Sequence, residues 1–91
     1  MIQTLKVNLE ANVRSTVVSV GGDGDGVRVL LYNETHGNHY CALGDHTVNL
    51  TNGIHFYGGE KLQLTVEAGE SLYAYATEAI DLRVMIMGAF D

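Results

Sequence analysis

The sequence predicts an all-β domain, a small antiparallel β-sandwich of the jelly-roll or immunoglobulin-like type with about eight short strands. Apolar and polar residues alternate with a period of two in several segments, such as LKVNL at residues 5–9, as expected for strands with one buried face. Turn-forming residues recur at intervals of about eight to twelve residues, a spacing typical of sandwiches and barrels. The 91 residues suffice for one hydrophobic core, so we expect a single domain over residues 1–91.

The N-terminal half contains five predicted strands. Alternation in LKVNL and TVVSV predicts the first two, over residues 2–9 and 13–20, and the glycine-rich sequence GGDGDG ends the second. The apolar run VRVLLYN predicts a third strand over residues 27–33. After the turn THGN, two shorter strands are predicted at 38–43 and 46–50, with a Gly-Asp turn between them.

The C-terminal half contains three more predicted strands. An Asn-Gly turn and a Gly-Gly turn precede KLQLTV, which predicts a strand at 61–66. Residues 67–81 contain good helix formers, but Gly69 interrupts them and small apolar residues then recur at every second position. We therefore predict a strand at 71–77, and the alternation in LRVMIM predicts the last one at 81–88.

Charge and hydropathy exclude two classes of partner. The chain has 5 Lys and Arg against 11 Asp and Glu, a net charge of -6, and its cations are scattered singly along the sequence. Nucleic-acid binding requires clustered cations, and a negative chain is repelled by an anionic membrane surface, so we expect neither partner. Apolar runs are far shorter than the roughly 20 residues of a membrane helix, and the N-terminus lacks the pattern of a secretory signal. We expect a soluble protein made in a reducing cytoplasm.

A cluster of His36, His39, Cys41 and His46 is the strongest candidate for a metal site. Imidazole and thiolate groups suit zinc, but zinc signatures consist of paired ligands with short spacing, and HxxHxC is not one of them. We therefore predict no metal site. The histidines are instead expected at the surface or in subunit contacts, where their charge changes near pH 6.

Two further patterns are similar to a calcium-binding loop and to part of a catalytic triad, but neither pattern is complete. Asp23 and Asp25 are spaced like calcium ligands, but the following residues break the EF-hand pattern, so we predict a solvated turn. Asp45 and His46 are adjacent, and adjacent residues of a strand point to opposite faces, which does not form a catalytic triad. No phosphate-binding loop or dinucleotide fingerprint is present. We expect neither an enzyme nor a bound cofactor.

Strands with two apolar faces indicate a protein interface. Tyr and Met alternate with smaller apolar residues in LYAYA and VMIM, so each strand is either buried on both sides or packed against another chain, where Tyr and Met are enriched. No proline blunts the sheet edges, and residues 1–12 are predicted to form an edge strand or an assembly arm. The candidate interface residues are Leu5, Val7, Leu9, Tyr73, Tyr75, Met85 and Met87.

The order of elements between Val27 and Phe90 carries a resemblance. VRVLLYN, YCALGDHTV, TNGIHFYGGEKLQLTV, LYAYAT and LRVMIM follow one another as in the small β-sandwich virion proteins of tailed bacteriophages, which this chain resembles. In those proteins Pro-Gly-Glu often precedes the LYA strand, whereas this chain has Ala68 in place of the proline, and the first 26 residues lie outside the resemblance.

The resemblance implies a structural role. The protein is expected to decorate or cement the outer surface of a phage capsid at the junctions between capsomers, with the major capsid protein as its partner and self-association as a trimer. It would be made in the host cytoplasm and located on the virion surface. Two alternatives remain open: a minor tail or connector component, and a carbohydrate-binding or tail-fibre recognition module. The latter would use tyrosines as stacking platforms, namely Tyr32, Tyr40, Tyr57, Tyr73 and Tyr75.

Overall fold

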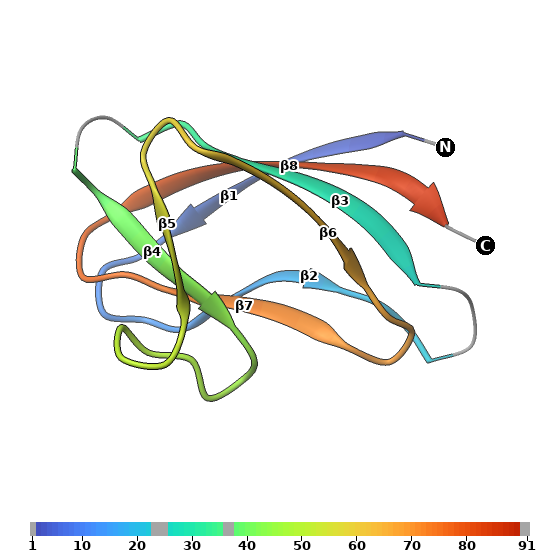
Figure 1. Cartoon of the computed structure of the whole chain (residues 1–91), viewed down its shortest axis with the longest axis horizontal. Coiled ribbons are helices and arrows are strands. Elements are labelled where there is room, and N and C mark those ends of the chain that lie inside the picture. The colour runs from blue at the N-terminus through green and yellow to red at the C-terminus, as the bar shows by residue number, and fades with distance from the viewer. Residues whose placement is uncertain (1, 23–25, 36–37, 90–91) are drawn as a thin grey trace.

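The protein folds as two four-stranded antiparallel sheets packed face to face (Figure 1). The computed structural model describes residues 2–22, 26–35 and 38–89. Within these residues no helix is long and apolar enough to cross a membrane. The strands are β1 (Gln3–Leu9), β2 (Ser15–Ser19), β3 (Val27–Asn33), β4 (Tyr40–Gly44), β5 (Ile54–Tyr57), β6 (Lys61–Val66), β7 (Ser71–Tyr75) and β8 (Ile80–Ala89).

The strand order is that of a jelly roll. Sheet A has the order β1-β8-β3-β6 and sheet B the order β2-β7-β4-β5. Strands pair antiparallel from the two ends of the chain inward: β1 with β8, β2 with β7, β3 with β6, and β4 with β5. The chain is therefore one long hairpin wrapped into two sheets. This confirms the predicted β-sandwich, and of the two predicted types the strand order is that of the jelly roll.

Alternating residues of both sheets meet in one core. Leu31 of β3 and Leu82 of β8 are fully buried in sheet A, and Cys41 of β4 and Phe56 of β5 face them from sheet B. Burying a side chain the size of leucine contributes about 1.5–3 kcal/mol. The period of two seen in the sequence thus corresponds to the inward face of each strand.

The predicted fifth strand was wrong, whereas the other seven are confirmed to within two residues at each end. Residues 46–50 lie in a loop, and the strand instead spans Ile54–Tyr57. In the loop the Asp45 carboxylate accepts hydrogen bonds from the backbone and hydroxyl of Thr47, and the Asn49 side chain accepts two from backbone amides. Such side chains compete with a sheet for backbone partners, which is why this short apolar pattern does not form a strand.

Among the described residues, one buried polar side chain joins the two sheets. Asn33, at the end of β3, is fully buried. Its Nδ2 donates to the carbonyl of Phe56 in sheet B at 3.1 Å, and its Oδ1 accepts from the backbone amide of Thr35 at 3.0 Å. Both ends of the amide are therefore satisfied, as a buried polar group requires.

Candidate functional site

The outward residues of sheet A form one surface, which we call face A. Lys6 lies opposite Arg83, Arg83 lies opposite Tyr32, and Tyr32 lies opposite Lys61, so these four side chains form a row across all four strands. Directly paired residues of an antiparallel sheet share one face. The paired residues of face A are Thr4, Lys6, Asn8, Arg28, Leu30, Tyr32, Lys61, Gln63, Thr65, Asp81, Arg83 and Met85.

An apolar groove occupies the centre of face A. Its volume is about 410 Å³, and its lining includes Leu30, Tyr32 and Met85. These three side chains are only half-buried. Charged side chains, Glu34 and Arg83, contribute to the lining beside them. An apolar centre with a charged rim is the composition of a protein-binding surface.

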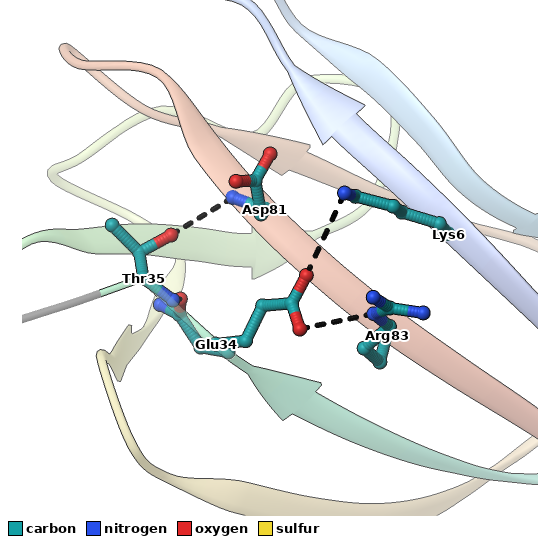
Figure 2. A network of polar contacts seen from close by, with 6 residues as sticks. Lys6, Glu34, Thr35, Asp81 and Arg83 are labelled. Carbon is teal, nitrogen blue, oxygen red and sulfur yellow. Dashed lines mark hydrogen bonds and ion pairs between the residues drawn. The ribbon is translucent and has the colours of Figure 1, made fainter.

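The Glu34 carboxylate holds two cations at the rim of the groove (Figure 2). Arg83 Nε donates to Glu34 Oε2 at 3.0 Å, and Lys6 Nζ lies 3.9 Å from Oε1. The start of β8 is fixed beside them, because the Asp81 backbone amide donates to Thr35 Oγ1 at 2.8 Å. Exposed ion pairs contribute only about 0–1 kcal/mol to stability, so this network positions charges more than it stabilises the fold.

Charge is distributed unevenly over the molecule. Four of the five cationic residues, Lys6, Arg28, Lys61 and Arg83, lie on face A, and the fifth, Arg14, precedes β2. The acidic residues of face A and its rim are Asp81 and Glu34. The other described acidic residues lie outside the strands of sheet A: Glu10, Asp45, Glu60, Glu67, Glu70 and Glu78. Face A is therefore a positive surface on a negative protein.

The outward residues of sheet B form face B, which carries an aromatic cluster. The ring centroid of Tyr40 lies 4.8 Å from those of both His55 and Tyr57. Tyr57 and His55 are exposed on the edge strand β5. His55 Nε2 lies 2.9 Å from the carbonyl oxygen of Leu50, which ties the cluster to the preceding loop.

That loop, residues 45–53, covers part of face B. Val48 at its centre is only 1% exposed, and Ala42, although it faces outward from β4, is 0% exposed. A Cβ atom on Gly53 would lie 2.6 Å from Val48 Cγ2, so the loop backbone approaches as closely as a glycine allows. Arg14 Nε donates to the Val48 carbonyl at 2.8 Å and fastens the loop to the start of β2.

The predicted interface residues do not form one surface. Tyr73 and Tyr75 lie on face B and Met85 lies on face A, on opposite sides of the sandwich, while Met87 falls where the register between β3 and β8 shifts. All four are half-buried. Four of the five tyrosines, all except Tyr32, lie on face B.

The predicted N-terminal residues face inward. Residues 3–9 form an edge strand of sheet A and pair with β8 along their whole length. Leu9 belongs to the core and Val7 packs against it, whereas Leu5 at the end of the sheet is 37% exposed. Sequence reasoning missed Leu30 and the cationic row, although alternation in VRVLLYN places Leu30 and Tyr32 on one face.

The structure separates the residues considered for metal binding. Cys41 lies in the core, and burial raises the pKa of its thiol to about 12. His39 instead contacts Glu78, with 2.8 Å between Nε2 and Oε2, and His46 is exposed on the loop over face B. The described residues contain no group of three or more His, Cys, Asp or Glu side chains able to hold a metal ion. His36, Asp23 and Asp25 lie outside the described residues.

Asp45 has a role in its own turn. Hydrogen bonds from the Thr47 side chain and backbone lower the pKa of its carboxyl group. Its Oδ1 accepts from Thr47 N at 2.9 Å and from Thr47 Oγ1 at 2.6 Å. The carboxylate therefore caps the turn that places Val48 over face B.

Comparisons with known proteins give one significant structural likeness. No protein-family model matches the chain, and no curated protein matches it significantly. A solved structure from Bacillus endospore appendages, described as a novel family of disulfide-linked pili, superposes with a TM-score of 0.56. The two sequences are 15% identical, and the likeness covers 94% of this chain and 84% of the other. At this identity the likeness shows a shared fold.

Proposed function

We propose that the chain is a non-enzymatic structural protein that works in many copies, each docked by its outer faces onto neighbouring proteins in the surface layer of a particle. The observation that carries this proposal is the groove of face A. Leu30 and Met85 remain half-buried at its centre, with charged side chains around them. A partner that covers this groove would remove apolar surface from water and match the rim charges.

The more specific form of the proposal is decoration of a tailed-phage capsid. It rests on the resemblance of residues 27–90 to small phage virion proteins, and the jelly roll agrees with it by analogy, because viral capsid domains use this fold. The major capsid protein is then the partner, and the protein self-associates as a trimer on the virion surface. Weak contacts suffice there, because many linked copies add their contributions.

The fold likeness favours a second candidate, a subunit of an extracellular appendage. The similar structure belongs to disulfide-linked pili. This chain has one cysteine, and Cys41 is fully buried. Burial raises the pKa of its thiol to about 12, which disfavours the thiolate needed for disulfide exchange. An appendage of this chain would therefore be held together by non-covalent contacts.

The aromatic cluster of face B supports the carbohydrate-recognition alternative. Tyr40 and Tyr57 are stacked with an interplanar angle of 28°, and Tyr57 is 42% exposed. A Tyr57→Ala variant tests it directly. Loss of glycan binding by this variant, in a protein that still folds, would favour recognition over structure.

Copy number tests the main proposal. Particles from the source are purified, and the chain is counted by quantitative mass spectrometry against a known component. Hundreds of copies per particle would support surface decoration, and a dozen or fewer would indicate a tail or connector component. Helical fibres composed of the chain would support the appendage candidate. Absence from every purified particle or fibre would overturn the structural proposal.

A further inference from the structure

We infer that face A binds the acidic turn between β6 and β7 of a second copy, so that copies associate head to tail. The turn comprises Glu67, Ala68, Gly69 and Glu70. This inference deepens the proposed structural function and rests on it, because it names the contact by which copies join. Its basis is the charge of the two surfaces and the lack of partners for four of these charges among the described residues.

Face A has cations with capacity for another partner. Arg28 and Lys61 are exposed and form no ion pair among the described residues. Lys61 Nζ instead lies over the Tyr32 ring, 5.6 Å from its centroid. Arg83 uses Nε for Glu34, and its side chain is 56% exposed, so the two terminal amino groups of the guanidinium can donate to a further carboxylate.

Four of the eight described carboxylates have a partner, and Glu10, Glu67, Glu70 and Asp81 have none among the described residues. Glu34 binds Arg83, Glu78 contacts His39, Asp45 accepts from Thr47, and the Glu60 side chain accepts from the Tyr57 backbone amide at 2.6 Å. By contrast, Glu67 and Glu70 are exposed and have no side-chain hydrogen bond or ion pair among the described residues. They lie three positions apart in one turn, which therefore presents two available carboxylates together.

The turn is rigid enough to act as a ligand. The Glu70 backbone amide donates to the Glu67 carbonyl at 3.1 Å, and Gly69 has a φ of 82°, which favours glycine at this position. The Gly69 amide also donates to the Val20 carbonyl at 3.1 Å, which anchors the turn to the end of β2. Little conformational entropy remains to be lost on binding.

The shapes of the turn and the groove correspond. The ends of a β-turn lie within about 7 Å of each other, and two small residues, Ala68 and Gly69, lie between the carboxylates. Arg83 and Lys61 flank Tyr32 on adjacent strands, which puts their backbones about 10 Å apart. The small residues would lie over Tyr32, which lines the groove, while one carboxylate meets Arg83 at the groove and the other meets Lys61 on the far side of Tyr32.

Charge also selects a second copy arranged head to tail. Two copies of face A facing each other would bring their cations together, and this symmetric contact is disfavoured by repulsion. A contact between two different surfaces repeats from copy to copy and closes into a ring when its rotation allows. Such a ring is compatible with the trimer of the proposed function.

Charge reversal on each surface tests the inference. Self-association of the full chain is measured by sedimentation velocity at low and high salt. Lys61→Glu on face A and Glu70→Lys on the turn should each raise the dissociation constant of self-association about tenfold or more, because each places like charges opposite one another. An equimolar mixture of the two variants should restore association, since the reversed face then meets the reversed turn. Glu10→Lys, the same charge change at an exposed site outside the contact, is the matched control.

The possible results separate this contact from the proposed function. Circular dichroism establishes that each variant is folded, and Lys61→Gln, a milder change, should weaken association less than Lys61→Glu. If the two charge reversals leave self-association unchanged, the head-to-tail contact is overturned. It is also overturned if the mixture of the two variants fails to restore association. A second result would also overturn the head-to-tail contact: the protein never self-associates, but Lys61→Glu abolishes its incorporation into particles. Face A would then bind a different partner. The copy count per particle tests the proposed function in each case.

Discussion

The two outward faces of the sandwich differ in how their apolar side chains are covered. On face B the chain covers its own sheet, because loop 45–53 folds back and buries Val48 against Ala42. On face A the corresponding region is an open groove lined by Leu30 and Met85. We therefore propose a division of roles: the covered apolar contacts on face B contribute to folding, and the open groove on face A is available for assembly.

The largest expected effect comes from placing one charge on each face. Val48→Asp buries a carboxylate without a partner and should lower the free energy of unfolding by about 3–5 kcal/mol. Leu30→Asp places the same group in an open groove and should cost less than about 1 kcal/mol while weakening self-association. Urea denaturation and sedimentation velocity measure the two quantities. Equal destabilisation by both variants would contradict the division of roles.

Removing the polar link between the sheets should have the next largest effect. Asn33→Ala removes the hydrogen bond to the Phe56 carbonyl and leaves that buried acceptor without this donor. The expected loss is about 2–4 kcal/mol of unfolding free energy, measured by urea denaturation. Asn33→Asp, which keeps the acceptor atom but not the donor, should also be destabilising. An ordinary hydrogen bond contributes about 1 kcal/mol to stability. A loss of unfolding free energy smaller than about 1 kcal/mol for Asn33→Ala would therefore show that the link between the sheets is not required.

A methyl group added beneath loop 45–53 should destabilise the packing on face B and leave face A unchanged. In Gly53→Ala the new Cβ would lie 2.7 Å from Ala42 Cβ and 3.1 Å from the Leu43 carbonyl oxygen. We expect a loss of about 1–3 kcal/mol from overpacking, with no direct effect on face A. Gly22→Ala is the control, because its Cβ would meet nothing within 4 Å. Thermal unfolding of both variants checks the prediction.

The thiol of Cys41 predicts a dependence of stability on alkaline pH. Burial raises its pKa from 9.0 to about 12, so the folded state retains a proton that the unfolded state loses above pH 9.0. Its contribution is complete below pH 9.0 and is lost as the pH rises toward about 12. The slope should reach at most about 1.4 kcal/mol per pH unit. Cys41→Ala should lack this part of the slope in urea titrations at a series of pH values.

The smallest effect is expected at the rim of face A. Glu34→Gln weakens the contacts with Arg83 and Lys6 and should change the free energy of unfolding by less than about 1 kcal/mol. It also raises the net positive charge of face A, so association with an acidic partner should strengthen at low salt. Sedimentation velocity at two salt concentrations measures this change. Weaker association of the variant would indicate that Glu34 positions Arg83 for the partner.

Local pattern predicted the strands well where burial follows a simple period. VRVLLYN and KLQLTV give strands with the predicted limits, since each has an inward residue at every second position. The loop at 45–53 was missed because side chains of Asp45 and Asn49 take backbone partners that a strand would need. The pattern did not predict which candidate interface residues share a face, because sheet membership is a non-local property. The strands β7 and β8 are consecutive but belong to opposite sheets. The local patterns LYAYA and VMIM do not indicate this.

The pairing of the first strand with the last also determines when the protein can fold. Gln3 lies opposite Ile86 and Leu9 opposite Ile80, so β1 has no partner until β8 has left the ribosome. Loops of this length are costly to close, and folds built on distant pairings form slowly. Sheet A is therefore completed only after β8 has been synthesised. Until β8 arrives, the inward side of β3, including Val29 and Leu31, lacks its central neighbour and is exposed to aggregation.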